Sequence, residues 1–316
     1  MLNLAFIGSR ADAERYGAIT NRIDGAKWSV YFLLDGPKQT AHANVLGSAI
    51  ESASIADMLS SHAGDIDAFV IHAPLGTLPE LVSAAAQSTR PLLVGPLVAK
   101  SNDDLSSLVD SAGKSTLLSA CSWRFIPAIQ SVKTTIDAGN LGDIGLIRIH
   151  RWNSQVTATS HDLASRIIAD IDLATWFFGK RPQKIFAMNS TASTAYLQIH
   201  LHFDNGGMAV IDEAGAMPNG GDYFSLTVIG GTGAAYADDH RNMNLIVDGV
   251  YPHAIRTEQG GVHLARQLQS FVDSIRTEAP YPIRQQDVAN VLQITNAALQ
   301  AAATKQVLTW EESRYV

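Results

Sequence analysis

Short apolar runs alternate with helical patterns over roughly the first 118 residues. The apolar runs are four to eight residues long and are bounded by turn residues, which is typical of buried strands. The segments between them carry apolar residues at helical spacing. The sequence predicts strands over residues 4–7, 28–34, 67–72, 91–94 and 116–121, and helices over residues 11–22, 54–61, 78–87 and 102–112. Strands alternating with helices predict a parallel sheet covered by helices on both faces.

The pattern changes after residue 121. The strands that follow alternate apolar and polar positions, as in an antiparallel or mixed sheet with one wet face. Asp204-Asn205-Gly206-Gly207 predicts a hairpin turn between two of them. The predicted strands cover residues 145–152, 184–189, 195–203, 208–214, 223–230 and 233–238, and the predicted helices cover residues 126–138, 163–178, 263–276 and 286–304.

The turn after the first strand resembles a dinucleotide fingerprint, G-x-G-x-x-G/A. Gly8 and Ala13 fill the first and third positions, and Ser9 stands between Gly8 and Arg10. Arg10 replaces the second glycine, where it crowds a pyrophosphate or pairs with one of its phosphates. Asp35 ends the second strand, where an acid can bind the ribose hydroxyls and favours NAD over NADP. The alternative is that Asp35 only begins a turn.

These patterns predict two domains in an α/β fold. Residues 1–120 form a Rossmann-type, doubly wound parallel sheet that binds a dinucleotide. Residues 121–316 form an α+β domain with an open, mostly antiparallel sheet. The last helix of this domain packs back on the first domain.

Composition narrows the class of protein. The chain has 316 residues and a net charge of −7, and its Lys and Arg residues are scattered, which argues against a nucleic-acid partner. Cys121 is the one cysteine, so an intrachain disulfide is excluded, and its apolar surroundings predict a buried structural role. The apolar runs are too short for a signal peptide or a membrane span, and we expect a cytoplasmic location.

Several motifs, in this order, resemble the Gfo/Idh/MocA oxidoreductases, the family of glucose–fructose oxidoreductase and inositol dehydrogenase. The resemblance covers nearly the whole chain. Its decisive part is the R-F-x-P entry at Arg124–Pro127, followed by a helix and the exit Gly139-Asn140-Leu141-Gly142-Asp143-Ile144. Other matching segments are Asp67–Pro74, Asp172–Gly179, Val228–Gly233, Leu268–Ile275 and Asp287–Ala303.

The resemblance implies a Rossmann domain followed by an α/β domain whose open sheet makes dimer or tetramer contacts. It implies NAD or NADP as cofactor, and sugars, cyclitols or related hydroxy compounds as substrates. In addition to the fingerprint turn and Asp35, it assigns cofactor binding to Ala73, Pro74, Gly95 and Pro96.

The catalytic positions of the family are occupied differently here. Its E-K-P motif reads Val94-Gly95-Pro96, so Gly95 stands in the lysine position, where we expect it to leave space beside the nicotinamide. The D-x-x-x-H positions fall on Ser165 and Ala169, and Leu78 stands where many members have histidine. None of these side chains can transfer a proton at neutral pH.

Two hypotheses follow from this pattern. In the first, the chain is a divergent oxidoreductase whose catalytic groups have moved, with Asp170, His161 and Arg124 as candidates. In the second, it is a non-catalytic homologue that binds a ligand or acts as a partner subunit. His200 and His202 share a strand face, but two histidines there are usually surface residues, and we predict no metal site.

Overall fold

The chain divides into two compact units in a computed structural model. Unit 1 comprises Met1–Phe125 and Gln259–Val288, and unit 2 comprises Ile126–Glu258 and Ala289–Val316. The sequence analysis assigned 121–316 to one continuous second domain, whereas residues 259–288 group with the first unit. The structure describes residues 1–36, 45–95, 102–154, 160–190, 196–217, 223–238, 243–247, 252–256, 261–312 and 314–316.

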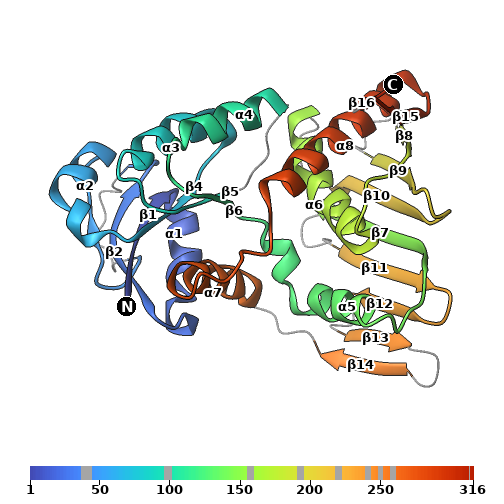
Figure 1. Ribbon diagram of the computed structural model, residues 1–316, viewed down its shortest axis with the longest axis horizontal. Helices are drawn as coiled ribbons and strands as arrows, with labels where there is room; N and C mark the ends of the chain where they lie inside the picture. The colour runs from blue at the N-terminus through green and yellow to red at the C-terminus, as the bar shows by residue number, and fades with distance from the viewer. Residues whose placement is uncertain are drawn as a thin grey trace. The chain divides into compact units, whose positions relative to one another are not determined.

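Unit 1 contains a six-stranded parallel sheet with the strand order β3-β2-β1-β4-β5-β6 (Figure 1). This is the order of the Rossmann fold, and it confirms the predicted doubly wound sheet. Its strands are β1 (Leu2–Gly8), β2 (Ala26–Leu33), β3 (Ile50–Glu51), β4 (Ala68–His72), β5 (Leu92–Gly95) and β6 (Leu117–Ser119). Its helices are α1 (Arg10–Gly17), η1 (Thr20–Arg22), α2 (Ile55–Ser61), η2 (Ala63–Asp65), η3 (Leu75–Thr77), α3 (Leu78–Ala86), α4 (Asn102–Ser111) and η4 (Ser122–Phe125).

The central strands form because their side chains are apolar on both faces. Ala5, Phe6 and Ile7 of β1 are fully buried, as expected for a strand covered by helices on both sides. Helix α7 (Val262–Arg276) also belongs to unit 1 and packs against η4. It buries Leu268 and Phe271 among other residues of one helical face.

Unit 2 is built on a ten-stranded sheet with the order β14-β13-β12-β11-β7-β10-β9-β8-β15-β16. Strands β7 (Ile144–Ser154) and β10 (Met208–Met217) are parallel, and the other pairs are antiparallel, which confirms a mixed, mostly antiparallel sheet. The remaining strands are β8 (Lys184–Asn189), β9 (Tyr196–His202), β11 (Tyr223–Gly230), β12 (Ala234–Asp238), β13 (Met243–Val247), β14 (Pro252–Arg256), β15 (Leu308–Glu311) and β16 (Arg314–Tyr315).

Among the described residues, helices cover one face of this sheet and leave the other open. Helix α5 (Pro127–Asp137) packs on β12, and α6 (Ser160–Phe178) packs on β7 and β10 (Figure 1). Ile147, Ile149 and Ile211 are fully buried on the covered face. The predicted hairpin at Asp204–Gly207 joins β9 to β10, where Met208 pairs with His202.

Helix α8 (Gln285–Thr304) begins in unit 1 and ends in unit 2. The helices in the described part of the chain are not long and apolar enough to cross a membrane.

Candidate cofactor-binding site

A pocket of about 450 Å³ lies in unit 1 at the carboxyl ends of β1, β2 and β4. Ligands of doubly wound sheets bind at this edge, because the loops that follow parallel strands gather there. The wall of this pocket includes three of the predicted cofactor residues outside the glycine turn, namely Asp35, Ala73 and Pro74. The full lining consists of Ser9, Asp12, Leu34, Asp35, His72, Ala73 and Pro74.

Gly8 turns the chain from β1 into α1 where a side chain has no room. A Cβ at this position would lie 2.8 Å from the carbonyl oxygen of His72 and 2.6 Å from the ring of Phe6. Only glycine permits this approach of β1 to β4, which is the role of the first glycine in a dinucleotide fingerprint. Ser9 then caps α1, with its Oγ accepting a hydrogen bond from the Asp12 backbone N–H.

Asp35 is held against the start of α1. The backbone N–H of Arg10 donates to its Oδ1 over 3.0 Å. This contact orients the carboxylate at the rim of the pocket, as recognition of ribose hydroxyls requires. The Nε of Arg10 is buried and has no hydrogen-bond partner among the described residues, so it can serve a phosphate oxygen. These groups fit a dinucleotide.

Three lining residues were not predicted from the sequence, namely Leu34 and the interacting pair Asp12 and His72. The Nδ1 of His72 lies 2.9 Å from Oδ2 of Asp12, and Ser9 donates to the same oxygen over 2.6 Å. Burial raises the pKa of Asp12, but the hydrogen bonds from His72 and Ser9 and the charges of His72 and Arg15 outweigh it and hold this pKa below its ordinary value. The signal for His72 was its position at the carboxyl end of a parallel strand.

Gly95 ends β5 beside this pocket, and its backbone oxygen accepts a hydrogen bond from the Ala73 N–H over 3.1 Å. The expectation that glycine leaves space at this position is wrong. A Cβ on Gly95 would lie 2.5 Å from the Cβ of Ala120, so Ala120 already occupies the side-chain direction. Pro96, the next predicted cofactor residue, lies outside the described residues.

Asp170, the first catalytic candidate, lies on α6 in unit 2 and is fully buried. Arg151 of β7 donates to both of its oxygens, with Nε 2.8 Å from Oδ2 and Nη2 2.6 Å from Oδ1. The side chain of Arg151 is 24% exposed and lies over the ring of Phe224 at 4.6 Å. A bidentate pair of this kind fixes both side chains.

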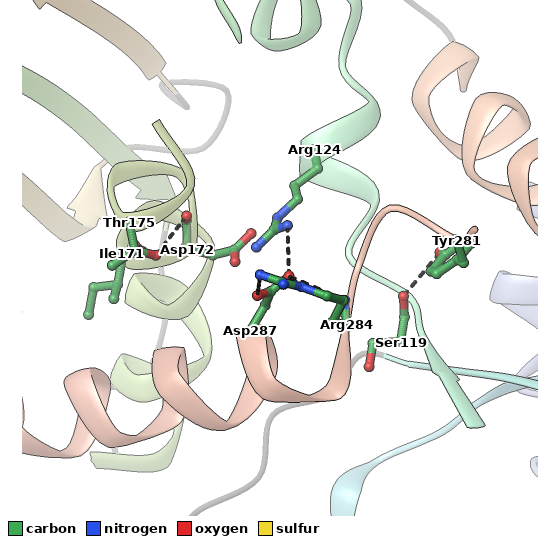
Figure 2. A network of polar contacts seen from close by, with 8 residues as sticks. All are labelled: Ser119, Arg124, Ile171, Asp172, Thr175, Tyr281, Arg284 and Asp287. Atoms are coloured by element: carbon green, nitrogen blue, oxygen red, sulfur yellow. Dashed lines mark hydrogen bonds and ion pairs between the residues drawn. The ribbon is translucent and has the colours of Figure 1, made fainter. Parts of the chain in front are cut away.

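The other two candidates are placed differently. Arg124 is nearly buried in unit 1, and its Nη1 lies 3.7 Å from Oδ2 of Asp287 (Figure 2). The carboxylate of Asp287 also forms an ion pair with Arg284. Nearby in the same unit, the hydroxyl of Tyr281 donates to the carbonyl oxygen of Ser119 (Figure 2). His161 falls within α6, but its side chain lies outside the described residues.

The two histidines considered as metal ligands, His200 and His202, are exposed on the open face of the sheet. The Nε2 of His200 lies 3.2 Å from the side-chain oxygen of Gln198. Within the part of the chain that the structure describes, there is no group of three side chains arranged to hold a metal ion.

Comparison with known proteins agrees with this architecture. Residues 129–236 match the model of the GFO/IDH/MocA C-terminal domain. No curated protein sequence matches the chain. Among solved structures, the chain is similar to myo-inositol 2-dehydrogenase from Lactobacillus plantarum, with 20% identity and a TM-score of 0.79 over 98% of this chain and 99% of that one.

Two further structures show the same fold. A myo-inositol dehydrogenase from Corynebacterium glutamicum has 18% identity and a TM-score of 0.77, over 98% of this chain and 99% of that one. An oxidoreductase from Agrobacterium radiobacter, solved with NAD+, L-tartaric acid and magnesium, has 15% identity and a TM-score of 0.80 over 98% of both chains. The chain therefore joins a Rossmann unit to a GFO/IDH/MocA C-terminal domain, and its predicted resemblance to the Gfo/Idh/MocA oxidoreductases is confirmed.

Proposed function

We propose that the chain is an NAD-dependent oxidoreductase that acts on a sugar, a cyclitol or a related hydroxy compound. The observation that carries this proposal is the pocket at the carboxyl ends of β1, β2 and β4, with Gly8 at its turn and Asp35 at its rim. The relatives by fold include inositol dehydrogenases and an oxidoreductase solved with NAD+, which supports the same cofactor and substrate classes.

In this proposal each group of the pocket has a binding task. Asp35 is held by the Arg10 backbone N–H and keeps Oδ2 available for ribose hydroxyls, while a 2′-phosphate would face its negative charge. The negative charge of Asp35 therefore favours binding of NAD over binding of NADP. Ala73 and Pro74 complete the walls of the pocket, and the unpaired Nε of Arg10 binds a phosphate oxygen. The cofactor, when bound, supplies a carbon that accepts or donates hydride.

In this proposal the group that transfers the proton is not at residue 95, where the family has its lysine, because Gly95 is packed against Ala120. Asp170, His161 and Arg124 remain the candidates for this role. Asp170 and Arg124 are held in ion pairs, which suits positioning better than proton transfer.

The test is a panel of sugars and cyclitols assayed for nicotinamide reduction with NAD and with NADP. We expect turnover of at least one compound, faster with NAD. Binding of NADH without turnover of any compound would instead favour the second function, a non-catalytic homologue that binds a ligand. The packing of Gly95 against Ala120 is the observation that supports this second function.

We also propose that the open face of the unit 2 sheet joins two copies of the chain in a homodimer or homotetramer. Successive strands place large apolar side chains on this exposed face, where a lone chain would leave them in water. They include Tyr196, Met208, Ile229 and Tyr236.

A further inference from the structure

Two carboxylates, those of Asp12 and Asp35, line the pocket of unit 1. The side chain of Asp12 is 20% exposed, and its lowered pKa keeps it ionised at neutral pH. It stands in the first turn of α1, the region where backbone N–H groups attract an anion. A dinucleotide adds a doubly charged pyrophosphate to the same region.

The N–H groups at the start of α1 are partly in use. The Arg10 N–H donates to Asp35, and the Asp12 N–H donates to Ser9. Both contacts satisfy donors that the first turn of a helix would otherwise offer to a phosphate. Apart from Arg10, whose Nε can serve a phosphate oxygen, a positive charge beside the carboxylate of Asp12 would offset the negative charge of that carboxylate.

His72 stands where this charge is required. Its Nδ1 contacts Asp12 over 2.9 Å, and its side chain is 23% exposed and lines the pocket. Of the seven lining residues, His72 alone carries a side chain that gains a positive charge near neutral pH.

Three elements present charged, aromatic or backbone groups around His72. Helix α1 presents Asp12, the exposed Arg15 that contacts Asp12 over 3.5 Å, and the ring of Tyr16 with its centroid 6.4 Å away. The loop after β2 presents Asp35 across the pocket, and β5 presents the backbone of Gly95, which pairs with His72 in the sheet. An entering pyrophosphate adds negative charge to this set, and negative charge nearby favours the protonated form of an imidazole.

We propose that His72 becomes protonated when a nicotinamide dinucleotide enters, so that cofactor binding takes up a proton at this side chain. The inference rests on the proposed NAD site. The proton comes from the solvent and stays on the imidazole for as long as the cofactor is bound. The imidazolium offsets the charge of Asp12 and leaves the pocket able to hold the phosphates.

The experiment is titration calorimetry of the full chain with NADH, in two buffers that differ in ionisation enthalpy. We expect the observed binding enthalpy to differ between the buffers by an amount that reports proton uptake. We also expect the affinity to fall about tenfold between about pH 6 and about pH 8.5, as the imidazole loses its charge.

Three variants assign the proton. His72→Asn keeps a donor toward Asp12 but cannot gain a charge, so proton uptake and the pH dependence should disappear together. Asp12→Asn removes the charge that His72 offsets, so affinity at high pH should rise above that of the wild type. His62→Asn is the matched control, because His62 lines a different pocket of unit 1, and its proton uptake should equal that of the wild type.

The outcomes separate the two claims. NADH binding with equal enthalpy in both buffers and equal affinity at both pH values would overturn the role of His72 and leave the NAD site standing. Proton uptake that persists in His72→Asn would overturn it as well. An absence of NADH binding at any pH would overturn the NAD site and this inference together.

Discussion

At residue 95 the chain passes so close to β6 that Ala120 occupies the place of any side chain. The packing of Ala120, which directly follows β6, therefore excludes a side chain at this position. Gly95 and Ala120 act as a matched pair, with the small residue on one strand allowing the approach of the other. A lysine at residue 95 would require Ala120 to change as well.

Gly95→Ala should lower the free energy of unfolding by about 1–3 kcal/mol, because the added methyl overpacks a site that is already filled. Urea unfolding followed by circular dichroism measures this change. Gly64→Ala is the control, since a Cβ at Gly64 meets no atom within 4 Å. Equal stability of the two variants would contradict the close packing at residue 95.

Helix α6 is joined to β7 by the pair of Asp170 and Arg151, and the stacking of Arg151 on Phe224 extends this contact to β11. An ion pair thus attaches the helix to the sheet in addition to its apolar contacts. Removing one member of a buried, bidentate pair leaves the other charge poorly compensated, which costs more than the pair itself contributes.

Asp170→Asn should therefore lower the free energy of unfolding by about 3 kcal/mol while leaving NADH affinity unchanged. The double variant Arg151→Met with Asp170→Leu should recover part of the loss, because it removes both charges. Denaturant unfolding of each variant measures this. Asp204→Asn, which breaks the exposed pair with Lys180, should change stability little. Full stability of Asp170→Asn combined with lost turnover would show a catalytic role instead.

For the whole molecule, periodicity predicted the fold well where a strand is long and its faces differ. The bounds of β8 and β11 match the predicted segments at both ends. Strands β13 and β14 were not predicted, and β14 begins with a proline, which weakens a strand pattern. The order of the motifs along the chain predicted the resemblance to the Gfo/Idh/MocA oxidoreductases, and residues 129–236 match the model of the GFO/IDH/MocA C-terminal domain.

The candidate site was predicted only in its local parts. Gly8 and Asp35 belong to a turn and a strand end that a short motif describes. The contact of Asp12 with His72 joins residues 60 positions apart, and the short fingerprint motif that contains Asp12 does not predict this contact. The clash that excludes a side chain at Gly95 likewise depends on Ala120 of a later segment. Such pairings come from tertiary packing, which one sequence does not display.

The open sheet face of unit 2 predicts association of copies of the whole molecule. Light scattering coupled to gel filtration should give the mass of a dimer or tetramer for the wild type. Ile229→Asp should shift the mass toward the monomer, because it puts a charge into the proposed contact. Ile50→Asp alters an exposed apolar residue of β3 in unit 1 and should leave the mass unchanged. A monomeric wild type would refute the interface.

The claim that unit 1 binds NAD through Asp35 is tested most directly by calorimetric titration of NADH and NADPH into the wild type, Asp35→Ala and Asp65→Ala. The account predicts tighter binding of NADH than of NADPH, a loss of at least about tenfold in NADH affinity in Asp35→Ala, and wild-type affinity in Asp65→Ala, whose residue lines another pocket. Equal NADH affinity in the wild type and Asp35→Ala, or no binding of either nucleotide to the wild type, would contradict it.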